Sequence, residues 1–210
     1  LEDLEKFEAS YARALAISPN SIPVNYGRAF GYAELKQYDK AIADIKKLLE
    51  LDEGNILARD LLATIYLSQE KYNDVIKVAD QLIKLDPTFT SAYDNRSYAY
   101  YKVGKYDLAI IDSYAAIRLD EKDARLRANF ISYSQKNYTL GLAKIASLIK
   151  EFPQKDIWLY IRSQLYRHKK DYPNALADFA KIFEMIPEGY QSYFLSASAE
   201  IYSEMGLHDK

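Results

Sequence analysis

The chain has 210 residues, of which 49% are hydrophobic and 28% are charged, and its net charge is −2. This composition is ordinary for a soluble folded protein and predicts no strong attraction to nucleic acid or to an anionic membrane surface. The absence of cysteine excludes disulfides, thiol catalysis and cysteine-based metal sites. No apolar run approaches the ~18 residues of a membrane span, so we expect no membrane insertion.

The chain begins with one helical pattern, in which Phe7, Tyr11 and Leu15 share a face. It is either the second helix of a pair whose first helix is missing or a capping helix. Three 34-residue stretches follow, and each predicts two helices joined by a short turn. Their predicted helices are 23–35 and 39–51, 57–69 and 73–85, and 91–103 and 107–119. Asp39, Asn73 and Asp107 are plausible N-caps of the second helices.

The next stretch is two residues shorter, and we place the deficit in its first helix or turn, about residues 125–135. Its second helix is predicted at 139–151 and contains Gly141. A glycine inside a helix costs ~1 kcal/mol relative to alanine, so we expect it to permit a close helix approach. The last full stretch is regular, with helices at 157–169 and 173–186. Residues 190–205 predict the first helix of a further unit.

Several residue types recur at a fixed period. One series, spaced 34, 34, 32 and 34 residues apart, is Tyr38, Tyr72, Tyr106, Tyr138 and Tyr172. A parallel series is Tyr32, Tyr66, Tyr100 and Tyr166, and a series of mostly small residues is Ala41, Val75, Ala109, Gly141 and Ala175. A unit of this size cannot bury its apolar face alone, so the period predicts stacked repeats. We interpret the nine tyrosines as core packing residues.

This period and pattern resemble the tetratricopeptide repeat (TPR) family over nearly the whole chain. In the central stretch the family's positions are occupied by Tyr93, Arg96-Ser97, Tyr100, Ala109, Ser113 and Glu121. The family's glycine position holds the small residues Ala29, Ala63, Ser97 and Ser163. The resemblance implies an all-α, right-handed superhelical solenoid of antiparallel helix pairs. We expect a single array, as a fragment of a longer chain, composed of a half-unit or cap at 1–21, repeats at 22–55, 56–89, 90–123, 124–155 and 156–189, and a half-unit at 190–210.

The resemblance implies a non-enzymatic module that binds a partner peptide or helix in its concave groove. Two alternatives stay open: a self-assembly scaffold that uses its uncapped ends or convex face, and a regulatory region of an enzyme whose catalytic domain lies outside these residues. No cofactor, metal or catalytic residue is expected, and we expect His168 and His208 to be exposed and non-catalytic. The compartment is unknown, with the cytoplasm slightly favoured over a periplasmic or secreted location.

In this family the first helix of each repeat lines the groove. The outward positions of those helices give thirteen candidate peptide-binding residues: Tyr26, Phe30, Asp60, Thr64, Asp94, Asn95, Tyr98, Tyr101, Arg125, Asn129, Tyr160, Gln164 and Arg167. Exposed aromatic residues with Asn and Arg are typical of interface hot spots. The alternative is that some of these tyrosines simply cover adjacent helices.

Two expectations concern the charge of this groove. It should be acidic toward Asp60 and Asp94 and basic toward Arg125 and Arg167. Some family members grip the C-terminal carboxylate of heat-shock chaperones through a clamp whose first position is lysine. Here Asp60 stands in that place, and an acid repels a carboxylate, so we predict no binding of chaperone tails.

Overall fold

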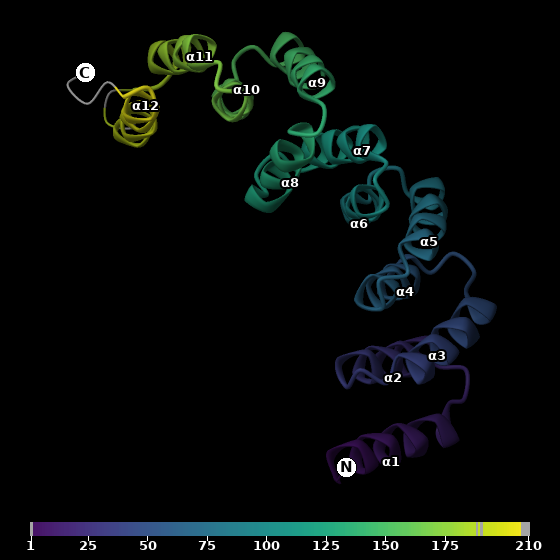
Figure 1. Ribbon diagram of the computed structural model, residues 1–210. Helices are drawn as coiled ribbons and strands as arrows, with labels where there is room; N and C mark the ends of the chain where they lie inside the picture. The colour runs from purple at the N-terminus through teal and green to yellow at the C-terminus, as the bar shows by residue number, and fades with distance from the viewer. Residues whose placement is uncertain (1, 188, 190, 207–210) are drawn as a thin grey trace. The chain divides into compact units, whose positions relative to one another are not determined.

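The computed structural model describes residues 2–187, 189 and 191–206. Within these residues it contains twelve α-helices and no β-strand (Figure 1). The chain divides into two compact units, Leu1–Val103 and Gly104–Lys210, which we call the N-terminal unit and the C-terminal unit. The all-α, TPR-like fold class is confirmed.

Each unit contains six helices of the described chain. The N-terminal unit has α1 (Glu2–Ile17), α2 (Ile22–Glu34), α3 (Tyr38–Leu51), α4 (Ile56–Ser68), α5 (Tyr72–Leu85) and α6 (Thr90–Lys102). The C-terminal unit has α7 (Tyr106–Leu119), α8 (Ala124–Ser134), α9 (Tyr138–Glu151), α10 (Asp156–His168), α11 (Tyr172–Met185) and α12 (Ser192–Glu204). From α2 to α11 every predicted helix boundary is confirmed to within one residue. The predicted start of the last helix, Tyr190, lies outside the described residues, as does His208.

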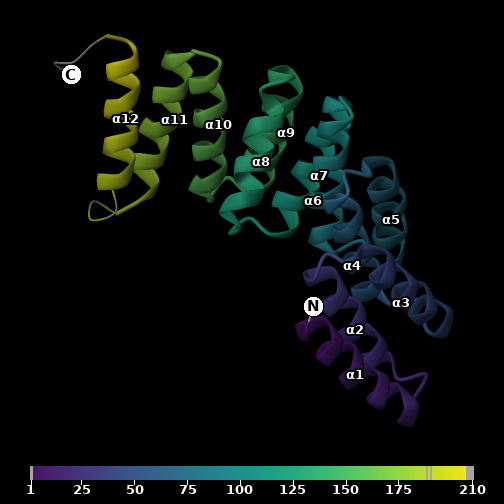
Figure 2. The same cartoon turned by 60° about the horizontal axis from the view of Figure 1, so that its bottom comes forward.

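Helices that follow one another in the chain pack as antiparallel neighbours. In the N-terminal unit α2 packs against α3, and α4 against α5; in the C-terminal unit α10 packs against α11. Figure 2 shows α10, α11 and α12 side by side. Consecutive first helices also touch, with contacts between α2 and α4, between α4 and α6, and between α8 and α10. Side chains about one repeat apart on these helices can therefore meet.

The ends of the first helices explain the short repeat. In four regular repeats the second residue after the helix has a positive φ: Lys36 57°, Glu70 56°, Gly104 77° and Lys170 62°. The next N–H donates to a carbonyl five residues back, as Gln37 does to Tyr32 at 2.8 Å, and this closes the helix end. Helix α8 has 11 residues instead of 13 and is followed by Gln135 in the right-handed region. The two-residue deficit therefore lies at the end of α8, as predicted.

Small residues lie where the helices come closest. The residues at the family's glycine position are fully buried, as are Ala41, Val75, Ala109 and Ala175 at the start of the second helices. Gly141 occupies that second position in α9. A Cβ atom there would lie 2.5 Å from both the Cβ and the Oγ of Ser134. The predicted close approach of helices at Gly141 is confirmed.

The core assignment of the nine tyrosines is confirmed in part: Tyr32 belongs to the core, and Tyr38, Tyr66, Tyr166 and Tyr172 pack against it. Only Tyr32 is buried, seven are half-buried, and Tyr106 is 38% exposed. The first series marks the first residue of each second helix, where a ring can pack on the helix pair while its hydroxyl stays in water. Most of the buried core consists of aliphatic side chains, with a few large aromatics such as Phe130, Trp158 and Phe179.

The predicted N-caps of the second helices are also wrong. The helices begin one residue earlier, so Asp39, Asn73 and Asp107 lie inside the first turn. The N-cap positions hold Gln37, Lys71 and Lys105, and none of these side chains makes a capping hydrogen bond. Asp39 and Asp107 still place negative charge near a helix N-terminus, which is favourable. Side-chain caps occur elsewhere, for example at Asn55, whose side-chain Oδ1 accepts from the Ala58 N–H at 2.9 Å.

Candidate functional site

A polar cluster joins the first helices of the N-terminal unit. Asp60 on α4 accepts a hydrogen bond from the Ser91 hydroxyl on α6 at 2.8 Å, and the Asn95 amide lies 3.4 Å from the same oxygen. Burial raises the pKa of the Asp60 carboxyl, while the bond from Ser91 acts in the opposite direction. Burial, followed by the nearby charge of Asp60, also raises the pKa of Tyr26 on α2. The repeat thus brings Tyr26, Asp60 and Asn95 together.

A pocket lies beside this cluster, between the C-terminal halves of α2 and α4. Its volume is about 300 Å³, and Phe30 and Thr64 are part of its lining. Leu61 and Ile65 supply buried apolar wall, and Phe30 is 47% exposed. Two predicted groove residues therefore line one cavity, which can accept an apolar side chain.

Helix α6 carries the aromatic part of the predicted groove in this unit. Tyr98 is 39% exposed, and its ring stands edge-on to Tyr72 with 6.3 Å between centroids. The Lys102 ammonium lies 5.3 Å from the Tyr98 ring centroid. Tyr101 is half-buried. Asp94 is only 8% exposed, so we remove it from the set of residues that a partner can contact.

The C-terminal unit has an aromatic cluster around Tyr160, which occupies the repeat position of Tyr26 and Asp60. Tyr160 on α10 shares a hydrogen bond with the Tyr193 hydroxyl at 2.9 Å, and its ring packs against Phe179 and Phe194. Burial, then the bond to Tyr193, raises the pKa of Tyr160 to about 12. The ring of Tyr160 thus covers α12, as the alternative interpretation of the tyrosines expects, and only part of it is open to a ligand.

Arg167, which was expected to make this part of the groove basic, is held by two acids. It donates from Nη1 to Glu200 at 2.9 Å and from Nε to Glu204 at 3.0 Å, and Nη2 also bonds Glu204. A pocket of about 570 Å³ is lined by Gln164, Arg167 and the exposed His168. The expected basic polarity therefore fails at Arg167, because two carboxylates more than offset its charge.

The remaining candidates lie on α8. Arg125 is exposed, with Nη2 3.5 Å from the Asp123 carboxylate, and Asn129 is half-buried. They do not line any of the pockets described here. The structure thus brings Tyr26, Asp60 and Asn95 together and places Phe30 and Thr64 in one pocket. Gln164 and Arg167 on α10 line a separate pocket.

Sequence analysis missed one repeated interaction. A polar side chain near the start of four first helices donates to the carbonyl six residues earlier: Asn25 to Pro19, Arg59 to Glu53, Tyr93 to Pro87 and Arg127 to Glu121. This bond ties each first helix to the preceding turn. The signal was present, since both donors and acceptors recur every 34 residues. The differing chemistry of the donors concealed it.

Among the residues that the structure describes, no helix is both long and apolar enough to cross a membrane. The described part of the chain also holds no group of three or more metal-ligating side chains suited to a metal ion.

Comparison with known proteins identifies the class. A family model described as tetratricopeptide repeat matches residues 23–55 and 90–123, and a second model with that description matches residues 133–189. Together they cover more than half of the chain, which therefore belongs to the tetratricopeptide repeat family. Repeats of this family serve in protein–protein interaction.

Individual relatives match only part of their own length. Sperm-associated antigen 1 of Mus musculus is 32% identical over 85 residues, which are 40% of this chain and 9% of that protein. Across the curated relatives that it matches, the chain spans between 9% and 34% of their length.

Two solved structures show the likeness of fold. YrrB, a TPR protein with an unusual peptide-binding site, has a TM-score of 0.59 at 18% identity, with 89% of this chain and 96% of YrrB covered. The first TPR of Spaghetti (RPAP3), bound to the HSP90 peptide SRMEEVD, has a TM-score of 0.53 at 21% identity, with 55% of this chain and 91% of that chain covered. At these identities the likeness concerns the fold alone.

Proposed function

We propose that the chain is a non-enzymatic interaction module whose first helices bind an extended segment of a protein partner. The observation that carries this proposal is the pocket between α2 and α4, because predicted groove residues Phe30 and Thr64 line it. A second pocket, lined by Gln164 and Arg167, occupies the matching repeat position in the C-terminal unit. Peptide-bound relatives such as the first TPR of Spaghetti are consistent with this use.

The chemistry of the two pockets indicates what each could hold. The pocket at Phe30 has apolar walls from Leu61 and Ile65 and suits an apolar side chain of the partner. The pocket at Gln164 is lined by polar and charged groups and suits a polar side chain. Tyr98 offers a large ring with a hydroxyl at low rotamer cost, which suits contact with an extended peptide.

The test begins with a peptide selected from a displayed random library on the wild-type chain. Its dissociation constant is then measured by fluorescence anisotropy for wild type and for the double variant Tyr98→Ala with Tyr101→Ala. We expect a loss of ~2 kcal/mol or more, or roughly thirtyfold, because aromatic residues dominate such interfaces. The matched control is Ile111→Ala with Leu119→Ala, two exposed apolar residues on the second helix α7.

Circular dichroism of each variant separates binding from folding. If the tyrosine pair unfolds the chain, Phe30→Ala probes the same surface, because Phe30 is 47% exposed. Full binding by both groove variants, with loss in the α7 pair, would place the interaction on the second helices and refute the proposal. Light scattering on the same samples tests the self-assembly alternative through the dependence of mass on concentration.

A further inference from the structure

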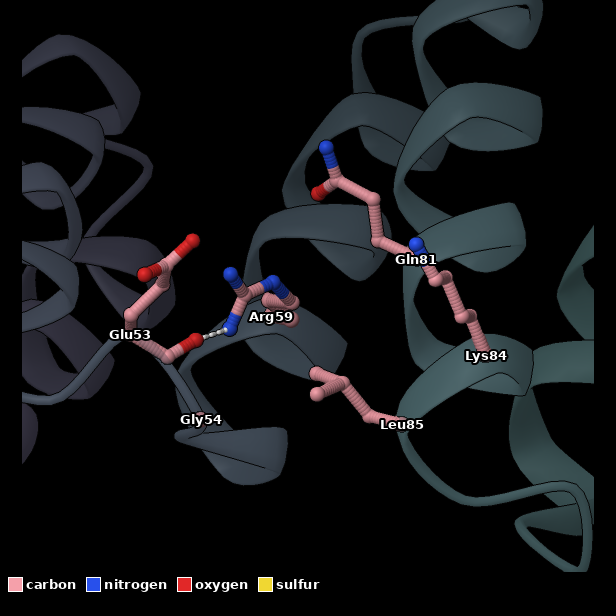
Figure 3. A pocket seen from close by; sticks show the side chains of 6 residues that line it. All are labelled: Glu53, Gly54, Arg59, Gln81, Lys84 and Leu85. Carbon is pink, nitrogen blue, oxygen red and sulfur yellow. Dashed lines mark hydrogen bonds between the residues drawn. The ribbon is translucent and has the colours of Figure 1, made fainter.

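A second pocket of the N-terminal unit is lined by none of the thirteen groove candidates. It has a volume of about 410 Å³ and lies where the α3–α4 turn meets the start of α4 and the end of α5. Figure 3 shows its lining residues, with Arg59 between Glu53 on one side and Gln81 and Lys84 on the other.

Arg59 is the buried charged group of this pocket, and its bonding is incomplete. It is only 9% exposed, and its Nη1 donates to the Glu53 carbonyl (Figure 3). Its Nε is buried and has no hydrogen-bond partner among the described residues. A buried donor without an acceptor is costly, so this edge of the guanidinium favours a ligand that supplies one.

The repeat shows which residue type Arg59 replaces. In the next repeat the same position holds Tyr93, which makes the same bond to the carbonyl six residues earlier, at 3.1 Å. Tyr93 is also the residue at the family's large aromatic position. Arg59 thus keeps the hydrogen bond made at this position but presents a charged guanidinium where Tyr93 presents a neutral ring. That guanidinium lines the pocket.

The charges around this space favour an anion. Arg59 and Lys84 contribute two positive charges and Glu53 one negative charge. In the C-terminal unit the equivalent acid, Glu121, is bound by Lys155 at 2.5 Å. Glu53 makes no ion pair among the described residues, and the pocket at Arg59 keeps a net positive charge.

We propose that this pocket binds an oxyanion, the carboxylate or phosphate group of a ligand, through the Nε edge of Arg59 with Lys84 and Gln81 as further donors. The guanidinium fork matches two oxygens of such a group. Gln81 and Lys84 are exposed and can rotate toward the same ligand. The site is independent of the proposed groove, since the two share no residue.

The experiment follows the Nε–H resonances of arginine by NMR while sodium phosphate or sodium acetate replaces chloride at constant ionic strength. We expect the Arg59 signal to shift and saturate. The signal of Arg13, an exposed arginine whose Nε already faces the Ala9 carbonyl, serves as internal control. Tighter binding of phosphate would point to a phosphorylated ligand, and tighter binding of acetate to a carboxylate. Equal, unsaturated shifts at both arginines would overturn the proposal.

Variants make the assignment specific. Lys84→Gln should weaken phosphate binding about tenfold or more, because a charge-assisted hydrogen bond is lost. Arg59→Tyr, which installs the residue of the next repeat, should abolish the saturable shifts of neighbouring amides and keep the fold. Glu53→Gln should tighten binding, since it removes a competing acid. If Glu53→Gln instead lowers the melting temperature without tighter binding, the Glu53 carboxylate is itself the acceptor, and the proposal is wrong.

Discussion

Gly141 on α9 offers a sharp test of the helix packing. At an exposed helical site, replacing glycine by alanine stabilises a helix by ~1 kcal/mol. Here the new Cβ would lie 2.5 Å from the Cβ and Oγ of Ser134 on α8, where carbon atoms normally approach to about 3.5–4.0 Å. The Cβ of Ser134 is fixed to its backbone and cannot rotate away. The helices must therefore separate by about 1 Å.

The magnitude follows from two opposing effects. Overpacking a rigid contact costs ~1–3 kcal/mol, and we take the upper end because backbone-carried atoms collide. Helix propensity returns about 1 kcal/mol. Gly141→Ala should thus lower the free energy of unfolding by about 2 kcal/mol, measured by urea denaturation with far-ultraviolet circular dichroism. Ala143→Gly, at an exposed position of the same helix, measures the helix-propensity difference between alanine and glycine in α9 without the packing contact.

A second substitution distinguishes this clash from other causes. Ser134→Gly in the Gly141→Ala background moves the missing Cβ from one helix to the other and should restore most of the loss. The Ser134 hydroxyl is also buried without a partner among the described residues, so its removal leaves no broken hydrogen bond. A coupling energy near zero in this double-mutant cycle, or a Gly141→Ala protein more stable than wild type, would refute the packing argument.

Three further predictions concern charged and titratable groups. Asp178→Asn should lower the free energy of unfolding, measured by urea denaturation, by about 3 kcal/mol, because Asp178 is buried and accepts two hydrogen bonds from Arg162, one of them at 2.8 Å from Nε. A change below about 1 kcal/mol would contradict this. The pKa of Tyr160 should be about 12, so its contribution to stability is complete below the ordinary tyrosine pKa near 10 and is lost as the pH rises from there through 12. If the ultraviolet titration of the wild type coincides with that of the Tyr160→Phe variant, this prediction is contradicted. A peptide ending in Glu-Glu-Val-Asp should not bind, because Asp60 stands at the first clamp position; micromolar affinity by calorimetry would show this prediction to be wrong.

The sequence was sufficient to predict the helices because the residue pattern that marks them recurs along the chain. Apolar spacing and small residues recur at a period of 34 residues, with one interval of 32, so errors in one repeat are corrected by the others. The position of the short repeat was found in the same way, by counting from Glu121 to the next repeat end. Predictions of helix position concern the backbone, and they do not require knowing which side chains contact one another.

Burial of individual side chains was predicted less well. Tyr106 and its equivalents were assigned to the core because they recur, yet recurrence marks only a shared position. The start of a second helix lies at the edge of the helix pair, where a tyrosine ring is half covered. Asp94 was assigned to the groove surface by the same counting, and it is buried. Each step of one residue along a helix rotates the side chain by about 100° around the helix axis, and this rotation is enough to change an exposed position into a buried one.

Partners between repeats were not predictable from one repeat at a time. Arg167 bonds Glu204, 37 residues away, and Asp60 bonds Ser91, 31 residues away. Both pairs join consecutive first helices, so their separations fall close to the repeat length. An acid or hydroxyl about one repeat from a groove arginine or aspartate is thus a candidate partner. A search at that spacing would have indicated that Arg167 is paired.

The position of Arg59 shows how a repeat array can vary its binding chemistry without changing its fold. Asn25, Arg59, Tyr93 and Arg127 make the same bond to the preceding turn, so the backbone requirement is met by any donor of sufficient reach. What differs is the charge of the donor side chain and the bonding of its other polar atoms, and only Arg59 leaves its Nε buried without an acceptor among the described residues. A repeat can therefore gain an anion pocket by one substitution at an aromatic position, while the alanine positions that set helix spacing remain unchanged.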